Sequence, residues 1–253
     1  MEPQMIDIIQ LGGARRESIR TAPFIVLPVG SIEYHGPHAP LGTDTTLAVG
    51  FAKRLCERFS AILLPPVTYT FAPSITSRHL GTVSISPDVF LEYLYQVLLA
   101  LAANGARRIV ALNGHSENQF ALRLAAERLA LEYPESSVLY VNWWKLVGIG
   151  RDAPSEGLFT DHGGHGHGGP LEISTVAAFD PSGVEPHLAT NIEYESPWWR
   201  VAGQAVGVGQ EPEGFSGFHG RVDEIDPAKG EVLVDEVSEN LARMVEEWLE
   251  RTS

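Results

Sequence analysis

Three clusters of acidic and histidine side chains have the residue types that bind metal ions and transfer protons. The first places Glu33 and His35 in GSIEYHGPH and Asp44 a few residues later. The side chains of residues two apart in an extended chain point to the same side. Glu33 and His35 can therefore bind two adjacent metal ions, and Asp44 can bridge those ions. The alternative interpretation is a polar loop in which Asp44 caps the next helix.

The second cluster is His115 and Glu117 in NGHSEN. Taken alone, it is also typical of a turn and a helix start, where an acid in the first turn is favoured by the helix dipole. Two such pairs, each after a predicted strand, favour a metal site. With Asp44 they offer two histidines and three carboxylates, a set suited to zinc, manganese, iron or cobalt rather than copper(I).

The third cluster holds His162, His165, His167 and Glu172 in the glycine-rich stretch DHGGHGHGGPLEIS. The histidines could form a metal site of their own, supply a proton-transferring group to a site built elsewhere, or belong to a mobile loop. Glu172 falls in the first turn of a predicted helix, so it has the same dipole-based alternative as Glu117.

The elements that must position these clusters alternate between strand and helix. Apolar runs predict strands at 24–29, 61–67, 108–113 and 137–143, and longer periodic segments predict helices at 45–59, 86–104, 117–133 and 232–251. This alternation predicts an α/β fold with a mostly parallel sheet. Ligands gather at the carboxyl ends of such strands, where the first two clusters lie.

Two stretches, 148–169 and 181–220, are irregular. We interpret the first as a loop or lid and the second as a long active-site or oligomer-contact segment, in which Trp198 and Trp199 are candidate contact residues. Disorder is the alternative for the second stretch. Because the sequence has no internal repeat or linker, it predicts one domain over residues 1–253.

Composition restricts the class of protein. A net charge of −14, from 32 acids against 18 bases, argues against a nucleic-acid partner, which needs a basic surface. The single cysteine, Cys56, excludes an internal disulfide and a cysteine-rich zinc site. No segment is typical of a signal peptide or of the roughly 20 apolar residues of a membrane helix. We therefore expect a cytoplasmic protein without a membrane partner.

In their order and spacing, GSIEYHGPHAPLGTD, NGHSEN and HGGPLEIS resemble the creatininase (creatinine amidohydrolase) family. The likeness runs from about Phe24 to Ala178 and more loosely through Glu224 to Glu231. It implies a three-layer α/β/α fold, a site for two divalent metals, and hydrolysis of a C–N bond in a small cyclic amide or a related small molecule. It also implies a homo-oligomer, by family resemblance a hexamer.

Carried over residue by residue, the resemblance implies one metal on Glu33, Asp44 and His115. It implies a second on His35, Asp44 and Glu117. His167 matches the proton-transferring histidine. Glu172 matches a carboxylate close to the substrate and is a rival to Glu117 as ligand. The remaining expected substrate contacts are Ser116, Trp144 and His79.

Departures from the family concern the substrate. Creatininase proper has a tyrosine where this chain has Ser116 and a tryptophan where it has Gly163, and the loop around His79 is shorter than usual. Trp144 matches an aromatic residue of the family pocket, although a tryptophan at a strand end is as often core. The metal chemistry therefore carries over, whereas creatinine as the substrate does not.

The sequence predicts a binuclear amidohydrolase that uses zinc, manganese or both, with iron or cobalt as alternatives, on a small-molecule substrate. A biosynthetic deformylase or a peptide-trimming hydrolase on the same scaffold is the first alternative. A metal-binding or storage protein without catalysis, and a structural subunit that has lost activity, are alternatives of other classes.

Overall fold

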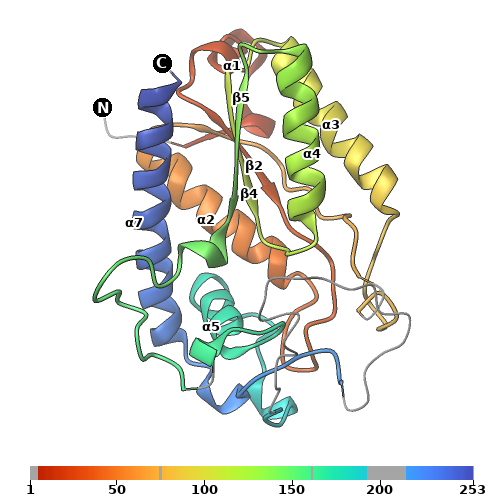
Figure 1. Cartoon of the computed structure of the whole chain (residues 1–253), viewed down its shortest axis with the longest axis vertical. Coiled ribbons are helices and arrows are strands. Elements are labelled where there is room, and N and C mark those ends of the chain that lie inside the picture. The colour runs from red at the N-terminus through yellow and green to blue at the C-terminus, as the bar shows by residue number, and fades with distance from the viewer. Residues whose placement is uncertain (1–4, 74–75, 161, 193–214, 253) are drawn as a thin grey trace.

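A parallel sheet of five strands forms the centre of the protein (Figure 1). The computed structural model describes residues 5–73, 76–160, 162–192 and 215–252. Along the sheet the strand order is β1-β3-β2-β4-β5. The strands are β1 (Ile6–Asp7), β2 (Ile25–Val29), β3 (Ile62–Leu63), β4 (Arg108–Asn113) and β5 (Ser137–Asn142).

Helices cover both faces of this sheet. On one face lie α3 (Pro87–Ala103) and α4 (Asn118–Glu132), and on the other lie α2 (Thr43–Phe59) and α7 (Pro227–Arg251), as Figure 1 shows. The shorter α5 (Pro170–Phe179) packs against α7 and α2, and α1 (Ser18–Thr21) precedes β2. This arrangement confirms the predicted three-layer α/β/α fold.

Strand residues alternate between two buried cores. In β4, Val110 and Leu112 pack in the core beside α2 and α7, whereas Ile109 and Ala111 pack in the core beside α3 and α4. A strand covered on both faces needs apolar side chains at consecutive positions. This requirement explains why the central strands stand out in the sequence as continuous apolar runs.

The structure differs most from prediction at four elements. Neither β1 nor α1 was predicted. Strand β3 ends at Leu63 rather than Val67, because Pro65 and Pro66 follow and a proline has no N–H for the ladder. Helix α7 begins at Pro227 rather than Val232: the Asp226 carboxylate accepts a hydrogen bond from the Ala228 N–H at 2.8 Å, and proline suits the first helical position.

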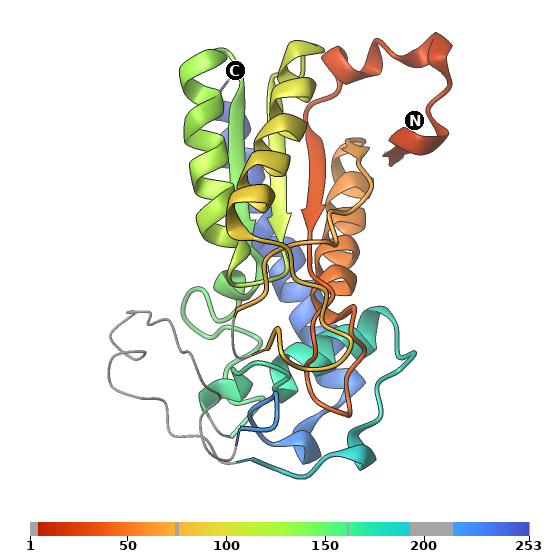
Figure 2. The same ribbon diagram turned by 90° about the vertical axis from the view of Figure 1, so that its right-hand side faces the viewer.

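The carboxyl ends of the strands point toward the end of the molecule where α5 lies (Figure 2). Segments 30–42, 114–117 and 163–169 meet there, so the predicted clusters come together at this edge. Asp161, Trp198 and Trp199 lie outside the described residues. Among the residues that are described, no helix is long and apolar enough to span a membrane.

Candidate metal centre

Asp44 stands at the centre of the site rather than at a helix cap. Gly42 is the N-cap of α2, and Asp44 lies in the first turn with its side chain 2% exposed. The Ser31 hydroxyl donates a hydrogen bond to Asp44 Oδ2 at 2.5 Å. The carboxylate is therefore turned into the protein toward the ends of β2 and β4.

One group of potential ligands joins Asp44 to Glu33 and His115. His115 Nδ1 lies 3.0 Å from Glu33 Oε2 and 3.1 Å from Asp44 Oδ2. All three side chains are buried. Their donor atoms lie within 4.8 Å of one another, which is close enough for one cation to contact all three.

A second group shares Asp44 and adds His35 and Glu172. His35 Nε2 lies 3.3 Å from Asp44 Oδ1 and 3.8 Å from Glu172 Oε2. The two oxygens of Asp44 therefore face different histidines, Oδ2 toward His115 and Oδ1 toward His35. This is the arrangement of a carboxylate able to bridge two cations.

A backbone carbonyl fixes, for each histidine ring, which nitrogen carries the N–H group. His35 Nδ1 lies 3.0 Å from the Glu33 carbonyl oxygen, and His115 Nε2 lies 3.1 Å from that of Phe71. A carbonyl can only accept, so these nitrogens carry the N–H groups, and in neutral rings the other nitrogens present lone pairs to the carboxylates. Metal-binding histidines typically donate their second N–H in this way.

Buried polar atoms of the cluster fit a cation. Within the described part of the chain, Glu33 Oε1 and His35 Nε2 have no hydrogen-bond partner although both are buried. Buried polar atoms normally have a hydrogen-bond partner, so unpartnered ones favour a bound group. Nitrogen and carboxylate oxygen donors together suit zinc or manganese. The residues present therefore fit divalent metal ions.

The electrostatics of the metal-free cluster point the same way. Burial by itself would lower the pKa of His35, but Asp44 and Glu172 raise it to about 10. The pKa of His115 is also raised, by Glu33 and Asp44 against the effect of burial. Without metal, protons on these rings balance the carboxylates. A bound cation would take their place, so metal binding would release protons.

His167 lies beside both groups. Its ring centroid is 4.0 Å from that of His35, and a ring nitrogen belongs to a further close set with Glu33 and His35. Nε2 lies 2.8 Å from the Tyr34 carbonyl oxygen, to which it donates. Burial and the neighbouring His35 lower the pKa of His167 to about 4. The ring is therefore neutral near pH 7, with Nδ1 free to accept a proton.

Two glycines allow the loops to approach one another this closely. A Cβ on Gly114 would lie 2.0 Å from the Asp44 carbonyl oxygen, so the turn after β4 reaches α2 only without a side chain. Gly168 has φ +66°, and a Cβ there would lie 2.4 Å from the His35 carbonyl oxygen. Glycine at these two positions lets the separate clusters form one site.

The remaining predicted residues are distributed around this centre. Among the described residues, Glu117 belongs to none of the close sets; it lies at the N-cap of α4 and is partly exposed. Ser116 is exposed beside His115. Trp144 packs against the core in part, and the His79 ring stacks on Tyr34 with centroids 4.7 Å apart. The close set on the His35 side of Asp44 therefore contains Glu172 and not Glu117. This geometry favours Glu172 over Glu117 as a ligand at that position.

Sequence reasoning assigned no role to two residues that support the ligands. Besides Ser31 on Asp44, Asn113 Oδ1 accepts a hydrogen bond from the His115 N–H at 3.1 Å. Ser31 was detectable, because Ser31, Glu33 and His35 alternate and an extended chain places them on one side. Asn113, as the last residue of a strand, gave no comparable signal.

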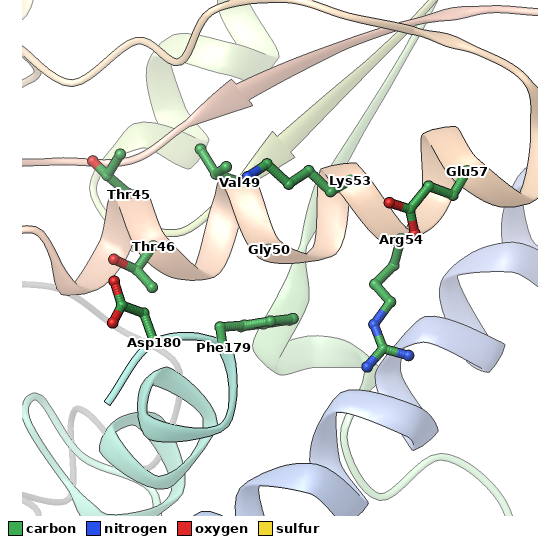
Figure 3. A pocket seen from close by; sticks show the side chains of 9 residues that line it. All are labelled: Thr45, Thr46, Val49, Gly50, Lys53, Arg54, Glu57, Phe179 and Asp180. Carbon is green, nitrogen blue, oxygen red and sulfur yellow. The ribbon is translucent and has the colours of Figure 1, made fainter. Parts of the chain in front are cut away.

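A separate groove of about 500 Å³ runs along the outer side of α2 (Figure 3). Phe179 and Asp180, at the end of α5, lie across it from α2. None of the candidate ligands lines it. The lining residues are Thr45, Thr46, Val49, Gly50, Lys53, Arg54, Glu57, Phe179 and Asp180.

Comparison with known families agrees with this geometry. The model of the creatininase family, creatinine amidohydrolase, matches residues 14–245. This chain belongs to the creatininase family. The resemblance read from the three sequence motifs is thereby confirmed.

Members of the creatininase family with related sequences act on different compounds. The 3-dehydro-scyllo-inosose hydrolase of Thermotoga maritima is 27% identical over 201 residues, which cover 79% of this chain and 58% of that protein. The mycofactocin precursor peptide peptidase of Mycobacterium tuberculosis is 34% identical over 188 residues, covering 69% and 66%. The match thus spans about three fifths to two thirds of these relatives.

Solved creatininases have the same fold. A mutant creatininase in complex with creatine aligns with a TM-score of 0.84 and 22% identity, over 97% of this chain and 99% of that chain. A manganese form aligns with a TM-score of 0.82 over the same shares, at 22% identity. A zinc–zinc form of a mutant aligns at 0.79 over the same shares, at 23% identity.

Proposed function

We propose that this protein is a binuclear metal-dependent amidohydrolase that cleaves a C–N bond of a small cyclic amide or a related amide. The observation that carries the proposal is the orientation of Asp44, whose two oxygens face His115 and His35 separately. Glu33 and His115 hold the first metal with Asp44, and His35 and Glu172 hold the second. Zinc and manganese are the metals proposed, by analogy with the related forms.

Bound divalent ions supply two effects: they lower the pKa of the attacking water, and they polarise the bond to be broken. His167 then performs the proton transfer. Because Nε2 donates to the Tyr34 carbonyl, Nδ1 takes the proton from the attacking water and passes it to the departing nitrogen. Without that proton the nitrogen leaves as a poor amide anion.

The substrate contacts are proposed from position. Ser116 follows the ligand His115 directly, His79 stacks on Tyr34 from the segment that carries Glu33 and His35, and Trp144 follows β5. Glu172, as a ligand at the edge of the site, is proposed to face the substrate as well. Ser116 replaces the larger tyrosine of creatininase proper. The pocket is therefore proposed to accept a compound other than creatinine.

Peptide trimming is the second candidate, because the mycobacterial relative at 34% identity is a precursor peptide peptidase. Deformylation and metal storage stay as weaker alternatives. Three predictions from the sequence remain predictions. They are a single domain over residues 1–253, a cytoplasmic location, and a homo-oligomer that is hexameric by family resemblance. The charge of −14 argues against a nucleic-acid partner.

A substrate screen tests the proposal. Protein loaded with manganese or with zinc is incubated with creatinine, other small cyclic amides, formamido compounds and short peptides, and the hydrolysis products are identified by mass spectrometry. We expect one amide class to be hydrolysed, with loss of turnover after chelation and in the His115→Ala variant. Hydrolysis that survives both treatments would contradict the metal-dependent mechanism.

A further inference from the structure

His38 lies beside the candidate metal centre, and the proposed reaction does not use it. Its side chain is 0% exposed, and its ring meets Phe218 edge-on with centroids 4.6 Å apart. His38 Nε2 lies 2.9 Å from the carbonyl oxygen of Gly168. Since that oxygen can only accept, Nε2 donates the hydrogen bond. The bond joins two segments that are 130 residues apart in the chain.

Gly168 connects this bond to the candidate site. Its N–H donates to Glu172 Oε2 at 2.8 Å, and its backbone lies against the carbonyl of His35 too closely to admit a Cβ. The residue before it is His167, whose ring lies on that of His35. A displacement of Gly168 therefore moves a proposed ligand and the proposed proton-transfer group together.

We propose that His38 is a positioning residue whose hydrogen bond to the Gly168 carbonyl holds Glu172 and His167 in place at the second metal site. This inference rests on the proposed function for what the site binds. It deepens that function by naming a residue that acts through the backbone of Gly168 and touches neither metal nor substrate. Groups that orient metal ligands in this way typically change affinity or activity by about 10–100-fold when they are lost.

Packing alone does not explain a histidine at this position. An aromatic hydrocarbon ring fills a similar space against Phe218, but it leaves the Gly168 carbonyl without its donor. Other bonds hold the same segment: the His219 N–H donates to the His167 carbonyl at 2.8 Å, and the Gly169 N–H donates to that of Gly166 at 3.0 Å. Loss of the His38 donor therefore releases Gly168 without unfolding the segment.

Two substitutions at His38 separate the donor from the packing. His38→Phe keeps an aromatic ring and removes the donor, whereas His38→Gln keeps an N–H at a comparable distance along the side chain. Ser136→Ala is the matched control. It removes another buried donor, the Ser136 hydroxyl that bonds the Ala106 carbonyl at 3.0 Å, just before β5 and at the opposite end of the sheet.

In the first measurement, each metal-free protein is titrated with manganese alone, and binding is measured by calorimetry. We expect His38→Phe to lower the affinity for the second equivalent of manganese about 10–100-fold and to leave the affinity for the first nearly unchanged. In His38→Gln the affinity for the second equivalent should be intermediate or near the wild-type value. Ser136→Ala should bind both equivalents like the wild type. Equal affinity for the second equivalent in His38→Phe and wild type would overturn the inference, as would a loss no larger than that of Ser136→Ala.

The second measurement does not depend on metal. Hydrogen–deuterium exchange of the metal-free proteins is followed at the Gly168 and Gly169 amides. We expect faster exchange there in His38→Phe, restored protection in His38→Gln, and no change in Ser136→Ala. If the wild type takes up no manganese, the proposed function fails, while unchanged exchange in His38→Phe independently refutes the positioning role.

Discussion

Replacement of Glu172 by glutamine should remove the second metal and spare the first. Glutamine has nearly the same shape as glutamate and keeps an oxygen that can accept from the Gly168 N–H, which lies 2.8 Å from Glu172 Oε2. It lacks the negative charge that faces His35 Nε2 at 3.8 Å. The substitution therefore isolates the charge of the proposed ligand from its packing.

The expected loss of metal affinity follows from the role of Glu172 as a direct ligand. A lost group that merely orients a ligand costs about 10–100-fold in metal affinity, so a lost ligand should cost at least about 100-fold, or about 2.7 kcal/mol. Burial, together with Asp44 and Glu33, raises the pKa of Glu172 to about 7. A neutral amide is therefore well tolerated without metal, and the metal-free variant should unfold close to the wild-type temperature.

Calorimetric titration of metal-free protein with zinc is the assay, and Glu117→Gln is the matched control. Glu117 carries the same charge and lies outside the close sets formed by the described residues. We expect Glu172→Gln to lose the second equivalent and Glu117→Gln to retain both. The reverse result would refute the geometric reasoning and support the ligand set carried over from the family.

Three further predictions concern single residues. His167→Ala should keep its metal content by elemental analysis and lose about 10²–10⁴ in kcat, whereas loss of metal would identify His167 as a ligand. Ser31→Ala removes the hydrogen bond to Asp44 Oδ2 and should weaken zinc binding by about 10–100-fold in calorimetry; unchanged affinity would make that contact incidental. Burial and the adjacent Glu57 raise the pKa of Cys56 to about 12, so its thiol should not react with a disulfide reagent at pH 8 until the protein is unfolded; rapid reaction of the native protein would contradict this burial.

The sheet was predictable from sequence because helices cover both of its faces. Strands β2 and β4 then require consecutive apolar residues, and such runs are visible without an alignment. Strand β1 is a two-residue element and gives no such run. Its pairing with β3 depends on contacts between segments that are distant in sequence.

The site was predictable in outline for a related reason. Glu33, His35 and His115 follow strands of one parallel sheet, and the carboxyl ends of those strands meet at one edge. The residues alone could not rank Glu117 and Glu172, because each is an acid at the start of a helix, and the family resemblance placed Glu117 first. The packing of α5 against α2 and α7 brings Glu172 close to His35, and this tertiary contact has no local signature.

The bond between His38 and Gly168 has the same origin. Its two residues are far apart in the chain, and neither has a pattern that names the other. A histidine in a proline- and glycine-containing loop is equally consistent with exposure. Only the folded structure shows that the His38 ring is buried and that its Nε2 donates a hydrogen bond to the Gly168 carbonyl beside the site.

The amount of metal bound per chain tests the central claim most directly. Purified protein is loaded with zinc or manganese, dialysed extensively, and analysed for both elements beside an identically treated His115→Ala variant. We predict close to two equivalents per chain in the wild type and a clear loss in the variant. No metal uptake by the wild type would contradict the binuclear site and leave only the fold and the family standing.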